Sequence, residues 1–246
     1  MPLTLAAVLP VCAGVFFAGF VSGLSGLAFP LIAGPIFLIV DPAPKAAALT
    51  AICSFTGQLF SIALLHQTIA YELRLPLIAA GLAGVPIGSA LLTRSDPHLV
   101  RFTLGLLIVL SGGWRLLGAR ARARIACAPS VWREAVVGLV GGLTGGLAGT
   151  SSVVPAIWCA ARGLDKSRQR AITQPFILVM QTALLASLWG WGALDQNIAR
   201  QYVDFVLPLL AGIGLGVVGF RALSSQAVTR LVMVVGAVSG FALLMS

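Results

Sequence analysis

GFVSGLSGLAFPLIAGPI, residues Gly19–Ile36, is an apolar stretch that is interrupted by glycines and prolines. A second stretch of the same kind, GGLTGGLAGTSSVVPAIW, occupies residues Gly141–Trp158. Two halves whose apolar helices are broken at corresponding places are typical of secondary transporters. Backbone that is not helical persists at membrane depth only where it is buried in protein or lines a cavity. These two stretches therefore decide the predicted fold.

Further matches between the halves follow the same order along the chain, which indicates a duplication. One residue inserted in the second copy aligns the glycine-rich breaks. The matched pairs are Ser22-Gly23 with Thr144-Gly145, Leu24-Ser25-Gly26 with Leu147-Ala148-Gly149, Ala48-Leu49-Thr50 with Ala171-Ile172-Thr173, Gln58 with Gln181, and Leu75-Pro76-Leu77 with Leu207-Pro208-Leu209.

The composition is that of a polytopic membrane protein. Of the 246 residues, 59% are hydrophobic and 9% are charged, whereas a soluble domain has roughly 25% charged residues. The net charge of +9 lies in short loops, where it sets membrane orientation, so we expect no nucleic-acid partner. The four cysteines form no CxxC pair, and we expect neither a disulfide framework, a metal site nor a cofactor.

Each half contains one broken stretch and three apolar runs that are long enough to cross a bilayer. The segments are Leu3–Val40, Ala46–Leu65, Leu75–Thr93 and Leu99–Leu117 in the first half, and Ala135–Ala161, Ala171–Gly190, Val203–Leu223 and Val228–Met245 in the second. We expect residues 1–118 to form the first membrane repeat, residues 119–133 a basic cytoplasmic linker, and residues 134–246 the second membrane repeat.

The basic residues decide the predicted topology. If each broken stretch crosses the membrane once, seven basic residues lie inside and nine outside. If each broken stretch turns back, twelve lie inside and four outside, which fits the positive-inside rule. We therefore predict an all-α polytopic membrane protein with two inverted repeats and both termini outside. Each repeat is a broken or re-entrant helix pair followed by three transmembrane helices; half-depth hairpins and two full crossings have the same parity.

The two breaks are the predicted anion site. A broken helix exposes backbone N–H groups, which attract anions. The alternative is that these small residues pack helices together; because the breaks are matched, we favour a site. The candidates are Ser22, Gly23, Ser25 and Gly26 in the first half, and Thr144, Gly145, Gly146, Gly149, Thr150, Ser151 and Ser152 in the second.

Polar residues in the helix after each break extend this candidate site. Thr50, Ser54, Gln58 and Ser61 share one helical face, and Thr173, Gln174 and Gln181 lie in the corresponding helix of the second half. Such a stripe should face protein or water rather than lipid, and interhelical hydrogen bonding is the alternative role. His66 is a candidate for proton coupling, or an interfacial histidine with no such role.

No carboxylate lies deep within an apolar run, which argues against an acidic cation site and against paired-carboxylate catalysis. We therefore expect a transporter and not an enzyme. A membrane enzyme and a membrane scaffold remain as alternatives of other classes.

Over nearly its whole length, the chain resembles the TauE/SafE sulfite exporter family. The resemblance rests on the SGLSG and TGGLAG turns, PAPKAAALT from Pro42 to Thr50, DKSRQRAIT from Asp165 to Thr173, and LLHQTI around His66. It departs from the family pattern at Leu27-Ala28-Phe29, Thr150-Ser151-Ser152 and Gln174-Pro175.

The resemblance implies a multi-pass protein of the bacterial inner membrane that exports sulfite or organosulfonates, and it is consistent with a homodimer. We expect alternating access around a site at the membrane midplane, with the two halves moving relative to each other. Transport of another small anion or metabolite is the alternative within this class.

Overall fold

The computed structural model describes residues 5–65, 75–94, 130–194 and 196–222, together with a few single positions between residues 96 and 234. Within these residues every regular element is an α-helix. The predicted segments Leu99–Leu117 and Val228–Met245 lie outside the described residues except at such single positions, and so do most of the basic linker and His66.

Eight long or medium helices make up the described part of the chain. They are α1 (Leu5–Ser25), α2 (Phe29–Val40), α3 (Ala43–Leu65), α4 (Leu75–Arg94), α7 (Val131–Ala148), α8 (Val153–Ala161), α9 (Lys166–Gly190) and α10 (Gln196–Ala222). Five of them, α1, α3, α4, α9 and α10, are long and apolar enough to cross a membrane. The predicted all-α, polytopic membrane class is therefore confirmed.

Each broken stretch consists of a longer helix, a short irregular segment and a shorter helix. The first has α1 with 21 residues and α2 with 12, which are about 31 Å and 18 Å long. The glycines at the two breaks, Gly26 and Gly149, have φ values of 82° and 69°. Only glycine adopts this left-handed region readily, so each glycine ends its helix, in the manner of a helix C-cap.

Four helices begin earlier than the sequence predicts, and the difference is five residues or more for α9 and α10. α9 begins at Lys166 rather than at Ala171, and α10 begins at Gln196 rather than at Val203. The carboxylate of Asp165 caps α9 by accepting a 2.9 Å hydrogen bond from the backbone N–H of Arg168. Polar first turns continue a helix beyond its apolar run, which is the only part that a hydrophobic pattern detects.

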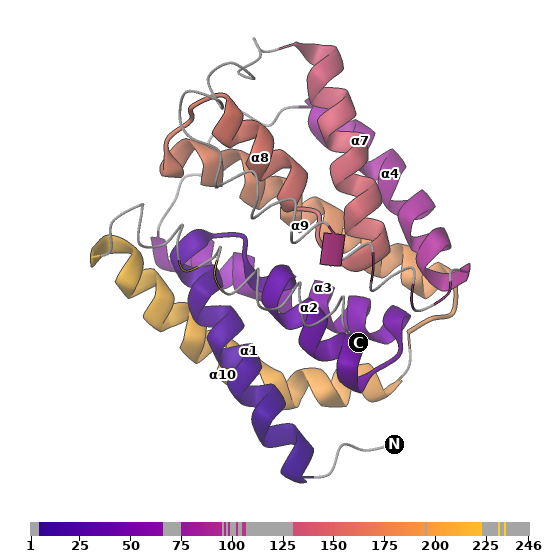
Figure 1. The fold of residues 1–246 in the computed structure, drawn as a ribbon, viewed down its shortest axis with the longest axis vertical. Helices are drawn as coiled ribbons and strands as arrows, with labels where there is room; N and C mark the ends of the chain where they lie inside the picture. The colour runs from indigo at the N-terminus through magenta and orange to yellow at the C-terminus, as the bar shows by residue number, and fades with distance from the viewer. Residues whose placement is uncertain are drawn as a thin grey trace.

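The two halves exchange their first helices. α1 packs most extensively against α10 of the other half, and α7 packs against α4; the two pairs lie in different parts of the molecule (Figure 1). Glycines allow the backbones to meet at these contacts. A Cβ atom on Gly212 or Gly216 of α10 would overlap the carbonyl oxygens of Phe16 or Phe20 in α1. The halves are therefore interlocked rather than side by side.

The α4–α7 pair repeats these contacts. A Cβ atom on Gly84 or Gly88 would overlap the carbonyl oxygens of Leu139 or Leu143. Gly84 and Gly88 therefore make the same kind of contact as Gly212 and Gly216. If the two helices are aligned on these contacts, their Leu-Pro-Leu motifs lie about one helical turn out of register.

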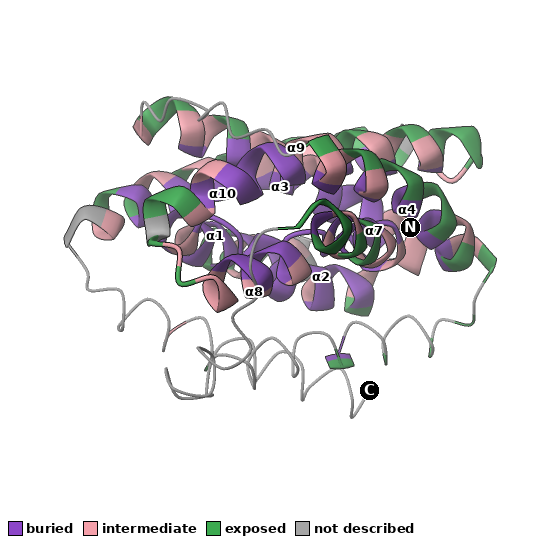
Figure 2. Cartoon of the chain, turned by 90° about the horizontal axis from the view of Figure 1, so that it is seen from above, coloured by how far each residue is buried: buried purple, intermediate pink, exposed green. Residues whose placement is uncertain are grey.

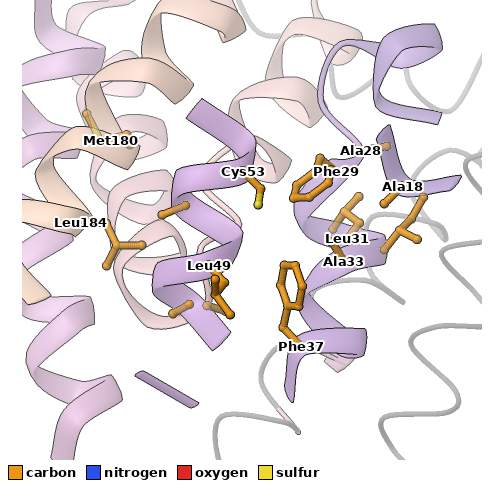
Figure 3. Packing of buried hydrophobic residues seen from close by; sticks show 14 of the residues in the cluster. Ala18, Ala28, Phe29, Leu31, Ala33, Phe37, Leu49, Cys53, Met180 and Leu184 are labelled. Carbon is orange, nitrogen blue, oxygen red and sulfur yellow. The ribbon is translucent and has the colours of Figure 1, made fainter. Parts of the chain in front are cut away.

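The buried residues gather in the middle of the molecule, on α2, α3 and α8 (Figure 2). α3 lies between two sets of apolar side chains, with Phe29 and Phe37 of α2 on one side and Met180 and Leu184 of α9 on the other (Figure 3). The outer faces carry exposed apolar residues such as Leu207, as a lipid-facing surface requires. The breaks and their polar residues therefore lie in the buried centre.

Candidate functional site

Each break is fixed by a glutamine from the next long helix of its own half. Gln58 of α3 donates from Nε2 to the carbonyl oxygen of Gly26 at 2.9 Å, and Gln181 of α9 donates to that of Gly149 at 3.1 Å. Both glutamine side chains are buried. Carbonyls at a helix C-terminus have no partner within the helix, so these amides satisfy groups that the breaks leave open. The difference in residue number between Gly26 and Gly149 is the same as that between Gln58 and Gln181. The structure therefore aligns each break with its glutamine without an inserted residue.

The first break also receives donors from the second half. Ser152 donates from Oγ to the carbonyl oxygen of Leu27 at 3.1 Å, and Arg170 donates from Nη2 to that of Gly23 at 2.7 Å. The second break is approached by α3, because a Cβ atom on Gly149 would lie 3.2 Å from Cγ2 of Thr50. Each break thus contacts both α3 and α9.

Several backbone N–H groups at the breaks are already hydrogen-bonded. In the first break, the N–H of Gly26 donates to the carbonyl of Ser22 at 2.6 Å, and those of Leu27 and Ala28 donate to Ser25 Oγ at 3.4 and 3.2 Å. The N–H of Gly149 donates to the carbonyl of the helix residue four positions earlier at 2.8 Å. Ser25 is therefore an internal cap, and these four N–H groups are not free to bind a substrate.

The predicted threonines also use their hydroxyl groups locally. Thr50 donates to the carbonyl of Ala46 at 2.7 Å, and Thr173 donates to that of Gln169 at 2.9 Å. Thr144 and Thr150 donate to backbone carbonyls at 3.1 and 3.2 Å. Because each of these hydroxyl groups already donates its hydrogen, its oxygen can only accept a further hydrogen bond.

Among the residues that the structure describes, a set of buried side-chain atoms has no hydrogen-bond partner, although such atoms are usually paired. On α3, at the second break and on α9, these atoms are Ser54 Oγ, Gln58 Oε1, Ser61 Oγ, Ser151 Oγ, Gln174 Nε2, and Nε and Nη1 of Arg170. Most belong to residues that the sequence singled out. These side-chain atoms could therefore bind a ligand in the interior of the protein.

Some of the predicted glycines serve helix packing, which was the alternative role. A Cβ atom on Gly23 would lie 2.5 Å from the carbonyl oxygen of Ile213 in α10, and one on Gly146 would overlap the carbonyl oxygen of Val85 in α4. Gly145 faces the second break, where a Cβ atom would lie 2.8 Å from Cβ of Ser151. Ser22 is buried and accepts from Gly26.

Sequence reasoning missed Arg170, which it placed in a loop among residues that orient the chain. The residue lies in α9, is 1% exposed, and has the largest fully buried side chain of the described residues. Its guanidinium carbon lies 4.3 Å from the ring centroid of Phe220. One feature of the sequence could have indicated its burial: Arg170, Gln174 and Gln181 share a helical face if α9 begins before Ala171.

The described residues contain no group of three histidine, cysteine or acidic side chains that could hold a metal ion. Their cysteines, Cys12, Cys53 and Cys159, carry free thiols.

Comparison with the curated proteins gives no match, and comparison with the solved structures gives none either. One family model, described as sulfite exporter TauE/SafE, matches residues 11–243. The chain therefore belongs to the TauE/SafE sulfite exporter family, whose members are membrane transporters.

Proposed function

We propose that the protein is a secondary transporter of the bacterial inner membrane that exports small sulfur-containing anions such as sulfite or organosulfonates. Family membership supports the transporter class and this kind of substrate. The five apolar helices support a multi-pass location.

The proposed substrate site lies between the two breaks. The observation that carries it is the direct link between them, in which Ser152 Oγ donates to the carbonyl of Leu27 at 3.1 Å. Within the described residues, Ser151 Oγ next to this link in sequence and Gln174 Nε2 on α9 are buried polar atoms without partners. Hydroxyl and amide donors in a region of low dielectric suit an oxyanion. The substrate would thus be held by side chains from both halves.

Alternating access would occur by movement of helix pairs rather than of the two sequence halves. The closest backbone contacts join α1 to α10 and α7 to α4, and each pair contains one helix from each half. A motion of whole halves would break these contacts, because close-packed interfaces do not deform continuously. We therefore propose that the α1–α10 pair and the α4–α7 pair move as bodies on either side of α3 and α9.

We retain the inverted repeat as a proposal, with residues 1–118 and 134–246 as the two repeats, residues 119–133 as a cytoplasmic linker, and both termini outside. Matched contacts at the breaks and in the helix pairs support the repeat. Arg170 lies in α9 and is therefore no longer counted among the basic residues of the cytoplasmic loops. Eleven basic residues inside against four outside still fit the positive-inside rule. A homodimer and proton coupling through His66 also remain proposals.

The test is anion flux into liposomes that contain the purified protein, with sulfite, methanesulfonate and acetate as probes. Ser151→Ala and Gln174→Leu should each reduce the flux of the sulfur anions, roughly fivefold or more for the loss of one ligand hydrogen bond. The matched control is Thr182→Ala, because Thr182 is exposed on α9 and bonds only to the carbonyl of Leu178. Wild-type flux in both variants would reject the site, and no saturable flux of any sulfur anion would reject the function.

A further inference from the structure

We infer that Arg170 is the charge-recognising residue of the anion site, and that it restricts the site to substrates with a single negative charge. The inference rests on the proposed function, because it assigns the substrate class of that site. The ligand chemistry is a monoanionic oxyanion, such as an alkylsulfonate or hydrogen sulfite.

The first argument is the position of the charge. Arg170 is 1% exposed, and a buried cation is costly unless it is paired. Within the described part of the chain no carboxylate pairs with it; its contacts are the carbonyl of Gly23 at 2.7 Å and the ring of Phe220 at 4.3 Å. Neither contact carries a full negative charge. The buried guanidinium therefore retains affinity for an anion.

The second argument is the unused donors. Guanidinium has five N–H bonds, and Nε and Nη1 of Arg170 have no hydrogen-bond partner. The side chain lies directly against the first break, since a Cβ atom on Gly26 would overlap Nε. One helical turn along the same face of α9, Nε2 of Gln174 is also buried without a partner. The unused donors of Arg170 therefore lie beside the first break, and that of Gln174 lies one helical turn away on the same helix face.

The third argument is asymmetry. The offset that relates Gly26 to Gly149 and Gln58 to Gln181 places Ala47 opposite Arg170, so the second break has no equivalent cation. The carbonyl of Ala47 and the side chain of Thr50 lie near Gly149 instead. Two other described basic residues lie beside a carboxylate instead: Lys45 pairs with Asp41 at 2.7 Å, and Arg168 lies 3.8 Å from Asp165. One guanidinium balances one negative charge and leaves a second charge of the substrate uncompensated.

Arg170 also has a structural contribution, which the test must separate from recognition. Its bond to the carbonyl of Gly23 places a positive charge at the C-terminal end of α1, a position that stabilises a helix. A variant can therefore lose stability without any loss of an anion ligand. Ligand binding is the readout that a purely structural arginine would leave unchanged in a folded variant.

The experiment measures binding of methanesulfonate and of sulfate to the detergent-purified protein by calorimetry at one fixed neutral pH. The wild type should bind methanesulfonate about tenfold or more tighter than sulfate. Arg170→Gln should weaken methanesulfonate binding roughly ten- to hundredfold, the usual range for a hydrogen bond to a charged group. Arg170→Lys should retain part of the affinity. The control is Arg168→Gln, because Arg168 is 71% exposed in the first turn of the same helix and should leave binding unchanged.

Wild-type binding of methanesulfonate by a folded Arg170→Gln variant would overturn the inference and leave the proposed function standing. If that variant does not fold, the wild-type ratio decides, and sulfate binding as tight as methanesulfonate binding would overturn the inference. A wild type that neither binds nor transports any sulfur anion would remove the proposed function as well.

Discussion

The side-chain amide of Gln58 donates a 2.9 Å hydrogen bond to the carbonyl oxygen of Gly26, where the chain leaves the first helix of its half. Gln181 makes the same bond to Gly149 at 3.1 Å in the second half. In both cases a long helix holds a turn that would otherwise leave a buried carbonyl unpaired. The shape of each break therefore depends on a residue far from it in sequence.

Replacing this glutamine should destabilise the fold. Gln58→Leu leaves the carbonyl of Gly26 buried without its partner, and we expect the free energy of unfolding to fall by about 1–3 kcal/mol. Gln181→Leu should have a similar effect, because it removes the matching bond. Unfolding by SDS titration in mixed micelles measures both variants. Thr182→Ala is the control on α9, and a Gln58→Leu variant as stable as this control would contradict the prediction.

Three glycines with positive φ form a graded series for substitution by alanine. Gly163 has φ 69° and no atom within 4 Å of an added Cβ, so Gly163→Ala should cost only the backbone strain of about 1–2 kcal/mol. Gly149 has the same φ but lies near Thr50, and Gly26→Ala should cost the most because its Cβ would overlap the side chain of Arg170. Thermal unfolding of the three variants checks this order.

The double variant Gly26→Ala with Arg170→Ala provides the control for the overlap. Removing the arginine side chain should make the Gly26 substitution less costly than it is in the wild-type background, with a coupling free energy of about 0.5–3 kcal/mol. Additive effects of the two substitutions would show that the two residues do not meet.

Neighbouring glycines of α10 should respond in opposite ways. Gly216→Ala places a Cβ atom against the carbonyl oxygen of Phe20 and should destabilise the α1–α10 pair by about 1–3 kcal/mol. Gly214→Ala meets no heavy atom nearer than Cε1 of Phe60 at 4.0 Å, and it should be neutral or stabilising by up to about 1 kcal/mol. Melting temperatures in detergent distinguish the two. Equal effects would mean that α1 and α10 are not in this contact.

The proposed topology predicts which thiols a membrane-impermeant reagent reaches. Cys127 lies in the basic linker and should react only from the cytoplasmic side, whereas a cysteine introduced by Ser246→Cys should react from outside. Cys53 and Cys159 are buried and give little background, and Cys12→Ala removes the partly exposed thiol. Labelling of intact cells and of inverted vesicles provides the measurement. External protection of the cysteine at position 246, with labelling only from inside, would reverse the orientation.

Local chemistry explains what the sequence could predict. Gly26 and Gly149 were among the candidates at the two predicted breaks, where glycine readily adopts the left-handed turn that ends each helix. The burial of Gln58 and Gln181 followed from polar residues in apolar runs. Contacts between distant segments were not predictable in this way. Nothing in the sequence separates Gly23, which packs against α10, from Gly26, which forms the break.

Arg170 shows a second limit. A hydrophobic pattern assigns a cluster of basic residues to a loop, and the exposed Arg168 fits that assignment. Two positions further along, α9 has entered the protein interior, where α1 and α10 supply a carbonyl and an aromatic ring. The difference between these two arginines is set by the helices around them and not by their neighbours in sequence.

The exchange of first helices also constrains how the chain is made. α1 leaves the ribosome before α10, the helix against which it packs most extensively, and all the other described helices are synthesised between these two. Until α10 is made, α1 lies in the bilayer without the helix that it packs against most extensively, whereas α4 lacks its partner only until α7 is made. The α1–α10 pair can therefore assemble only after α10 has been inserted. The first half of the chain expressed alone would lack the α10 surface against which α1 packs.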